Sequence, residues 1–184
     1  GLDENEDLFA PVIASAKSRA LWLGINLLTA FLASWTIGLF EATLEQVVAL
    51  AVLMPIVASM GGIAGSQTLT LIIRGLALGQ ITPQTYFTLM RKELSIGLIN
   101  GLLWALVIFG VTYLWFGDVI IGTVIALAIV INICVAALSG VVIPVWLEKA
   151  KIDPALSGSV ILTTITDVIG FFVFLGLGSL LLLP

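Results

Sequence analysis

The sequence predicts an all-α integral membrane protein with five transmembrane helices per protomer. Of its 184 residues, 60% are hydrophobic and only 10% are charged, and the mean hydropathy is +1.23. Such a composition is typical of chains whose solvent is the lipid bilayer, in which helices satisfy their own backbone hydrogen bonds. The second observation is that five apolar segments are each long enough to cross the hydrocarbon layer.

The five segments carry almost no charge and are separated by polar connections. They cover residues 21–40, 47–73, 94–116, 119–147 and 155–183. The second, fourth and fifth exceed the roughly 20 residues of a straight crossing, so we expect them to be tilted, bent or extended beyond the membrane. Pro55 and Pro144 are the expected bends in the second and fourth segments.

The longest connection, residues 74–93, predicts a short amphipathic helix that lies on the inner membrane surface. Thr82 and Pro83 suit the N-cap and the first helical position, and the apolar Tyr86 and Phe87 follow them. The alternative is that this segment extends the third transmembrane helix at its N-terminus.

Basic residues occupy alternate connections, and this pattern predicts the orientation of the chain. They are Lys17, Arg19, Arg74, Arg91, Lys92, Lys149 and Lys151. The other connections, 41–46 and 117–118, carry only acidic charge. By the positive-inside rule the N-terminus lies in the cytoplasm and the C-terminus outside, and we expect a multi-pass protein of a prokaryotic cell membrane.

Asp167 is the only charged residue inside any of the five segments, and it lies near the middle of the last one. A lone carboxylate in hydrocarbon is costly and commonly functional. The small and hydroxylated residues that share an arc of roughly 100° with it on a helix are Ser159, Thr163, Thr166 and Gly170. The structural alternative is a protonated or hydrogen-bonded carboxyl that helps to hold the helices together.

The second segment contains a run of small residues within 55–67, with Gly61 and Gly62 near its middle. A face this small lets another backbone approach closely, which predicts a helix-packing seam. The alternative is a locally opened helix whose carbonyls line a water-filled path. Because this segment runs inward and the fifth runs outward, we expect the two glycines at the depth of Asp167.

A single Asp167 is a poor site for a divalent cation, and five helices are few for enclosing a path. A symmetric dimer with its twofold axis along the membrane normal would bring two copies of Asp167 together. Two facing carboxylates repel each other unless a cation lies between them. Mg²⁺ suits this place, since it binds through one or two carboxylates and keeps several waters, which Ser159 and Thr163 would hydrogen-bond. The spacing alone does not distinguish Mg²⁺ from Mn²⁺ or Ca²⁺.

With these features the chain resembles the transmembrane domain of the MgtE family of magnesium channels and transporters, over nearly all of residues 10–184. The matching positions in the second segment are Pro55, Ser59, Gly61, Gly62, Gly65, Gln67 and 71–75. Those in and before the fifth are 153–155, Ser157, Gly158, Thr163, Thr164 and Asp167. The family usually has asparagine where this chain has Ile63 and Ser66.

The resemblance implies a homodimer whose pore is lined by the second and fifth helices of both protomers. Asp167 of each protomer would recognise a hydrated Mg²⁺ ion, with Thr163 and Ser159 as its neighbours in the metal site. The expected pore-lining residues are Thr166, Gly170, Gly61 and Gly62. Family members also carry cytosolic regulatory domains, which this sequence does not contain. We therefore expect residues 1–17 to be an acidic connector left from that link and 18–184 to be the pore domain, with a naturally short relative of the family as the equal alternative.

The predicted function is channel-like transport of Mg²⁺ across the bilayer, without an organic cofactor. An exchanger coupled to H⁺ or Na⁺ is the alternative, and a structural membrane subunit is less favoured. No enzyme is expected, because the sequence has no histidine for Ser-His or HExxH sites and one protomer offers only a single intramembrane aspartate. Nucleic-acid binding is not expected either, since topology explains the seven basic residues.

Overall fold

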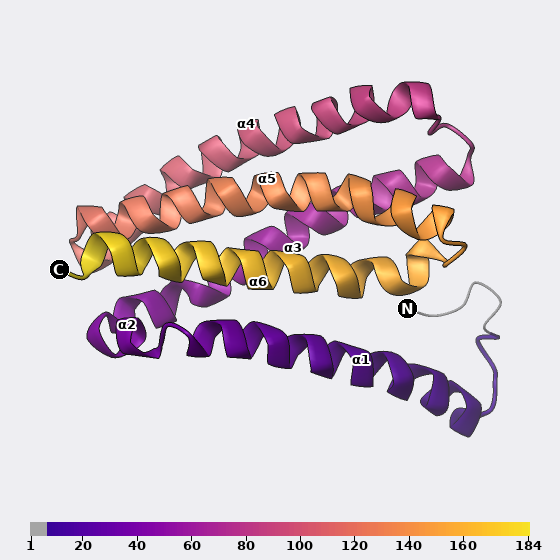
Figure 1. Ribbon diagram of the computed structural model, residues 1–184, viewed down its shortest axis with the longest axis horizontal. Helices are drawn as coiled ribbons and strands as arrows, with labels where there is room; N and C mark the ends of the chain where they lie inside the picture. The colour runs from indigo at the N-terminus through magenta and orange to yellow at the C-terminus, as the bar shows by residue number, and fades with distance from the viewer. Residues whose placement is uncertain (1–6) are drawn as a thin grey trace.

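The computed structural model describes residues 7–184, and within them the secondary structure is entirely helical (Figure 1). The helices are α1 (Val12–Gly38), α2 (Glu41–Gln46), α3 (Val48–Ala77), α4 (Pro83–Phe116), α5 (Val119–Lys149) and α6 (Pro154–Leu182). Five of the helices in this described part are long and apolar enough to cross a membrane. The predicted five-span helical protein is therefore confirmed. Asp3, Glu4 and Glu6 of the predicted connector lie outside the described residues.

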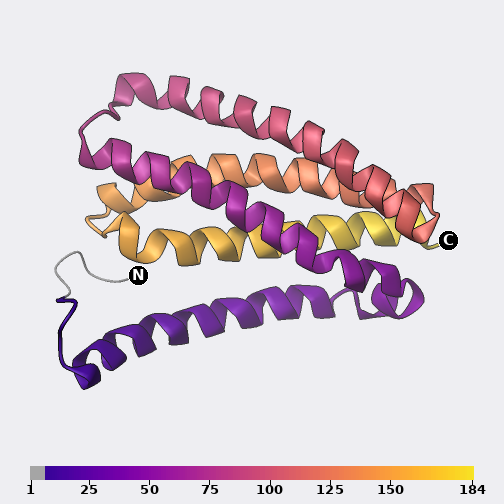
Figure 2. The same cartoon turned by 180° about the vertical axis from the view of Figure 1, so that it is seen from behind.

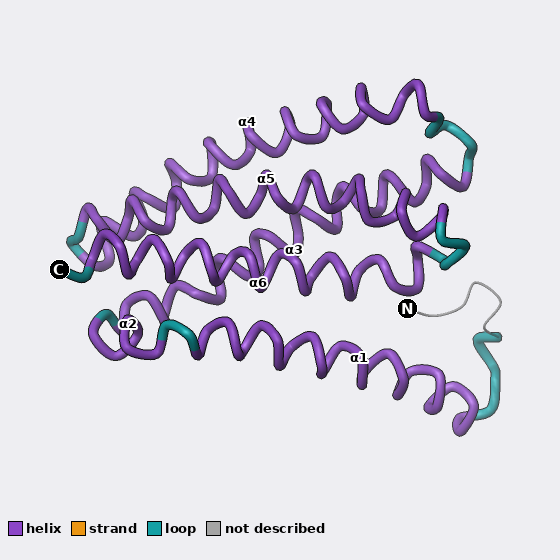
Figure 3. The backbone as a smooth tube through the Cα atoms, viewed as in Figure 1, coloured by secondary structure: helices purple, strands orange, loops and turns teal. Residues whose placement is uncertain are grey.

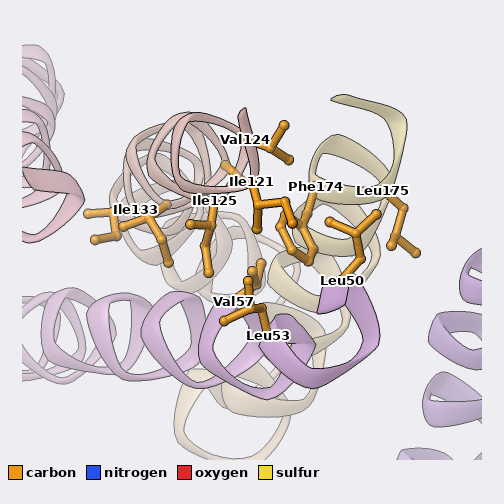
Figure 4. Close-up of a cluster of buried hydrophobic side chains, with 11 residues drawn as sticks. Leu50, Leu53, Val57, Ile121, Val124, Ile125, Ile133, Phe174 and Leu175 are labelled. Carbon is orange, nitrogen blue, oxygen red and sulfur yellow. The ribbon is translucent and has the colours of Figure 1, made fainter. Parts of the chain in front are cut away.

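Helix α5 is the centre of the bundle. It packs against α3, α4 and α6, whereas α1 packs on α6 and α4 scarcely touches α3. Seen from behind, α3 runs obliquely across the bundle (Figure 2). The main cluster of buried apolar side chains lies where α3, α5 and α6 meet, and Leu53, Ile125 and Phe174 are three of its members (Figure 4).

Short connections join the long helices, and local chemistry explains where they turn (Figure 3). Gly117 ends α4 with φ 67°, a left-handed conformation that glycine adopts at little cost. Asp118 then caps α5, because its carboxylate accepts hydrogen bonds from the backbone N–H groups of Ile120 at 2.7 Å and Ile121 at 3.3 Å. Asp153 caps α6 in the same way, through the N–H of Ala155 at 2.9 Å.

Helix α4 corrects the prediction for residues 74–93. It is one continuous helix of 34 residues, so the separate surface helix is wrong and the alternative, an extension of the transmembrane helix, is right. The cap was placed correctly, since Thr82 accepts a hydrogen bond from the N–H of Thr85 and Pro83 begins the helix. No helix-breaking residue follows Pro83 before the apolar run, so the helix continues for about 51 Å, well beyond the roughly 30 Å of hydrocarbon.

One other expectation changed. The acidic connection 41–46 forms the short helix α2, which is tied to α6 by a hydrogen bond between the hydroxyls of Thr43 and Ser179. Helices α3 and α5 continue through Pro55 and Pro144, and the bends expected at these two residues stay a prediction.

Helices α4 and α5 approach closely along two glycines of α4. A Cβ atom added to Gly97 would lie 3.0 Å from the Cβ of Ala137, and one added to Gly101 would lie 3.3 Å from the Cα of Val130. In a bilayer, where apolar surface gains little by leaving lipid, such close packing is a main source of helix association.

This contact predicts that Gly101→Leu destabilises the protein. The added side chain would push α4 away from the backbone of α5, at a cost of about 1–3 kcal/mol. Unfolding of the purified protein in detergent, followed by circular dichroism, measures the change. Gly110→Leu is the matched control on the same helix, because nothing lies within 4 Å of its Cβ position. Equal stability of the two variants would contradict the proposed packing.

Candidate functional site

Asp167 lies near the middle of α6 with its side chain half-buried. Within residues 7–184, no group donates a hydrogen bond to its carboxylate, and no three His, Cys, Asp or Glu side chains come together as a metal site. One chain therefore offers a single carboxylate here. Such a group can act as one ligand of a cation or as an acceptor for the waters that the cation carries.

Thr163 and Ser159 follow Asp167 along the same face of α6, one and two turns toward the start of the helix. Thr163 is half-buried and Ser159 is exposed. The Thr163 hydroxyl donates to the carbonyl of Ser159 at 2.8 Å, which leaves the hydroxyl oxygen able to accept from water. The three predicted metal-site residues thus form one polar stripe about 12 Å long.

Thr166 and Gly170 lie on the adjoining face of α6, which is buried inside the protomer. Thr166 is 0% exposed, and its hydroxyl donates to the carbonyl of Leu162 at 3.1 Å. A Cβ atom added to Gly61 of α3 would lie 3.3 Å from the Cβ of Thr166. The expectation that Gly61 reaches the depth of Asp167 is therefore confirmed.

The run of small residues in α3 is a packing seam. Residues 55–67 are α-helical throughout, so the alternative of a locally opened helix is wrong. Gly61 and Gly65 face α5 and α6, and a Cβ atom added to Gly65 would lie 2.8 Å from Leu162. Gly62 is half-buried with nothing within 4 Å of its Cβ position. Of the four predicted pore-lining residues, Gly62 alone is not buried within the described protomer.

Asn132 is a residue that sequence reasoning missed. It lies on α5, is 0% exposed, and its Nδ2 donates to the carbonyl of Val57 at 3.2 Å. A Cβ atom added to Gly170 would lie 2.6 Å from this Nδ2, and one added to Gly61 would overlap the same amide group. Its Oδ1 is buried without a hydrogen-bond partner in the part of the chain that the structure describes. The sequence feature that could have identified Asn132 is its position as the single side-chain amide near the middle of an apolar 31-residue helix.

Glu93 is a buried carboxylate of a membrane-length helix that sequence reasoning missed, because it lies just outside the apolar segment. The apolar run begins at Leu94, and the sequence pattern therefore left Glu93 in a connection. In the structure Glu93 belongs to α4, is 6% exposed, and accepts a hydrogen bond from Thr68 of α3 at 3.1 Å.

In the comparison with known proteins, the run of small residues in α3 and the Asp167 stripe of α6 both fall within the region that matches one family. A family model described as a divalent cation transporter, MgtE, matches residues 54–177. Magnesium transporters MgtE are 32% identical in Bacillus subtilis, over 90% of this chain, and 34% identical in Thermus thermophilus, over 92%. The magnesium transporter MgtE of Enterococcus faecalis is 28% identical over 98%. The chain covers 37%, 38% and 40% of these three relatives, or about two fifths of their length.

The fit between Asn132 and Gly61 predicts that Gly61→Ala destabilises the bundle. The new methyl group would meet the buried amide and force α3 away from α5, at a cost of about 1–3 kcal/mol. Thermal unfolding in detergent checks this. The control is Gly62→Ala, one residue along the same helix, where the methyl group meets nothing within 4 Å.

The same contact allows a second-site test. Removing the amide in the double variant Gly61→Ala/Asn132→Ala makes room for the methyl group, so its cost should be smaller than the sum of the two single changes. Strict additivity would show that the two residues do not interact.

Proposed function

Because the chain belongs to the MgtE family of divalent cation transporters, we propose that it carries Mg²⁺ across the cell membrane through a pore built by two copies. The observation that carries this proposal is Asp167. It is a half-buried carboxyl in the middle of a membrane-length helix, without a hydrogen-bond donor among the described residues and with Thr163 and Ser159 along the same face. The three relatives are named as magnesium transporters, which supports Mg²⁺ as the ion.

A homodimer follows from the number of ligands. One described protomer supplies one carboxylate at this depth, whereas two copies around a twofold axis supply two. Two carboxylates are enough for Mg²⁺, which typically keeps most of its waters in protein sites. The pair would repel in the absence of a cation, so the ion itself would stabilise the closely opposed arrangement.

The ion would pass in hydrated form. The two Asp167 carboxylates would accept hydrogen bonds from metal-bound waters, and the hydroxyls of Thr163 and Ser159 would accept from these waters in turn as the ion moves along α6. Gly62 of α3 would border this path. Gly61, Thr166 and Gly170 are buried within the protomer, so we propose that they form the wall behind it by holding α3 and α6 together.

The driving force would be the electrochemical gradient. With the N-terminus in the cytoplasm, as the basic connections predict, α6 begins at the inner face and the stripe from Asp167 to Ser159 leads inward. An inside-negative potential of 100 mV supplies about 2.3 kcal/mol per elementary charge, and twice that for a divalent ion. This free energy favours passive, channel-like uptake over transport driven by a catalysed reaction. No organic cofactor is part of the proposal.

The domain division remains a prediction. The three relatives are longer than this chain, and we propose that residues 18–184 correspond to their pore domain. Helix α1 begins at Val12, so the spanning part continues into the segment expected as an acidic connector. Cytosolic regulatory domains would belong to the remainder of the longer proteins.

Asp167→Asn should abolish most Mg²⁺ uptake into vesicles that contain the purified protein, because a neutral amide cannot replace the charge that attracts the hydrated ion. Uptake is followed with a Mg²⁺-sensitive dye at a fixed membrane potential. Asp118→Asn is the control, since it makes the same chemical change at the cap of α5, where asparagine caps as well as aspartate. Full flux through the Asp167 variant would remove this residue from the conduction site.

The same vesicles separate a channel from the coupled exchanger. At fixed voltage, a channel-like protein should give the same Mg²⁺ flux with or without an opposing H⁺ or Na⁺ gradient. A flux that rises steeply with either gradient would favour the exchanger instead.

The dimer predicts that the two copies of position 167 can be cross-linked across the twofold axis. In a Cys134→Ala background, Asp167→Cys should form a covalent dimer with a short thiol-reactive bis-maleimide, because its only thiol would face its copy across a gap that is too wide for a direct disulfide when it accommodates a hydrated ion. Non-reducing gel electrophoresis measures the product. Thr123→Cys, on α5, is the control and should stay monomeric. A monomeric Asp167→Cys variant would argue against opposed copies of α6.

A further inference from the structure

A cavity of about 180 Å³ lies between α3, α4 and α5, on a side of α3 away from α6. Its polar lining consists of Gln67, Thr68, Glu93 and Asn100. Asp167 does not contribute to it. The cavity has room for several waters, since one water occupies about 30 Å³ in the liquid.

Glu93 and Thr68 are the two most deeply buried of these polar residues. Its side chain is 6% exposed, and Thr68 at 5% donates to one of its carboxylate oxygens at 3.1 Å. Within residues 7–184, no lysine or arginine nitrogen lies within 4.0 Å of the carboxylate, although Arg91 and Lys92 immediately precede it. A buried carboxylate without a cationic partner costs several kcal/mol, so a partner from solution would stabilise it.

The remaining polar side chains add neutral oxygen donors. Asn100 lies two turns after Glu93 on α4 and donates through Nδ2 to the carbonyl of Ile96 at 3.0 Å, which leaves its Oδ1 as an acceptor. Gln67 precedes Thr68 on α3 and, like Asn100, is exposed. The lining therefore runs from an accessible rim of two amides to a buried carboxylate.

The Glu93 carboxylate makes the cavity suitable for a cation. The carboxylate repels anions, and the apolar remainder, which includes Trp104 and Ile133, provides no further charge. Hard cations prefer oxygen ligands, and Mg²⁺ in particular uses one or two carboxylates and fills its other positions with water.

We propose that the cavity between α3, α4 and α5 is a second cation site, in which Glu93 holds a partly hydrated Mg²⁺ ion with help from Thr68, Gln67 and Asn100. The site is separate from the Asp167 stripe, because none of the residues that line the cavity comes from α6. The choice of Mg²⁺ rests on the proposed function, whereas the existence of a cation site does not.

The test measures binding in a chain that already carries Asp167→Asn, so that the central carboxylate is removed. Mn²⁺ serves as the probe, and electron paramagnetic resonance counts the free ion in a titration of the purified protein in detergent. We expect about one Mn²⁺ per chain, displaced by Mg²⁺. Adding Glu93→Gln should weaken binding by about tenfold or more. Glu148→Gln, an exposed carboxyl at the end of α5, is the control and should leave binding unchanged.

Fluorescence locates the ion. Trp104 lines the cavity and the other four tryptophans do not, so bound Mn²⁺ should quench emission that is lost in a Trp104→Phe variant. If Glu93→Gln does not fold, Asn100→Ala and Gln67→Ala decide, because both change exposed side chains and leave the bond from Thr68 to Glu93 intact. They should weaken Mn²⁺ binding severalfold without lowering the unfolding temperature of the metal-free protein.

Three results would overturn the proposal. They are the absence of displaceable Mn²⁺ in the Asp167→Asn chain, equal affinity with and without Glu93→Gln, and unchanged affinity in both amide variants. Failure of the flux experiment on Asp167 would leave these measurements unaffected, so the two proposals stand or fall separately.

Discussion

The packing of the Asn132 amide between two glycines is the contact on which the arrangement of α3, α5 and α6 depends. Gly61 and Gly170 leave room for this side chain, and its Nδ2 donates to the carbonyl of Val57. In hydrocarbon no water can replace such a bond, so an amide at this depth favours one arrangement of three helices over others that would leave it unpaired. The Oδ1 atom has no hydrogen-bond partner among residues 7–184, so within this range the arrangement satisfies only part of the side chain.

That contact also sets which way Asp167 faces. Each residue turns an α-helix by about 100°, so burying Thr166 and Gly170 against α3 and α5 fixes the neighbouring stripe of Asp167, Thr163 and Ser159 at the edge of the protomer. If α6 were rotated by about 100°, the carboxylate of Asp167 would take the buried position that the hydroxyl of Thr166 now occupies. Glycine at positions 61 and 170 therefore acts indirectly on the face that carries Asp167, through the rotation of α6 that the close packing allows.

The five membrane-length helices and the cap of α4 could be predicted from sequence because they follow from local chemistry. Hydropathy located five spans, Thr82 with Pro83 marked the start of α4, and helical periodicity grouped Ser159 and Thr163 with Asp167. Asn132 and Glu93 could not be found in this way, because their importance depends on which helices they meet. Glu93 was also hidden by its position at the edge of an apolar run, next to two basic residues that belong to a connection by composition. The choice between a surface helix and an extension of α4 needed the course of the backbone itself.

The two carboxylates differ in a way that matters for ion transport. An ion that passes through a pore must bind well enough to enter and weakly enough to leave. Asp167 suits this requirement, since it is half-buried and receives no hydrogen bond in the described chain, so only its charge and its neighbours' hydroxyls would act on a hydrated ion. Glu93 is held by Thr68 at the buried end of an open pocket whose accessible rim carries two side-chain amides, a geometry that can replace part of a hydration shell. Replacing bound water makes release slower, because the leaving ion must recover its shell. In the two proposals, the same chain would combine a carboxylate arranged for passage with one arranged for retention, and an ion held beside α3 would act on the proposed pore by stabilising the helix that carries Gly61 and Gly62.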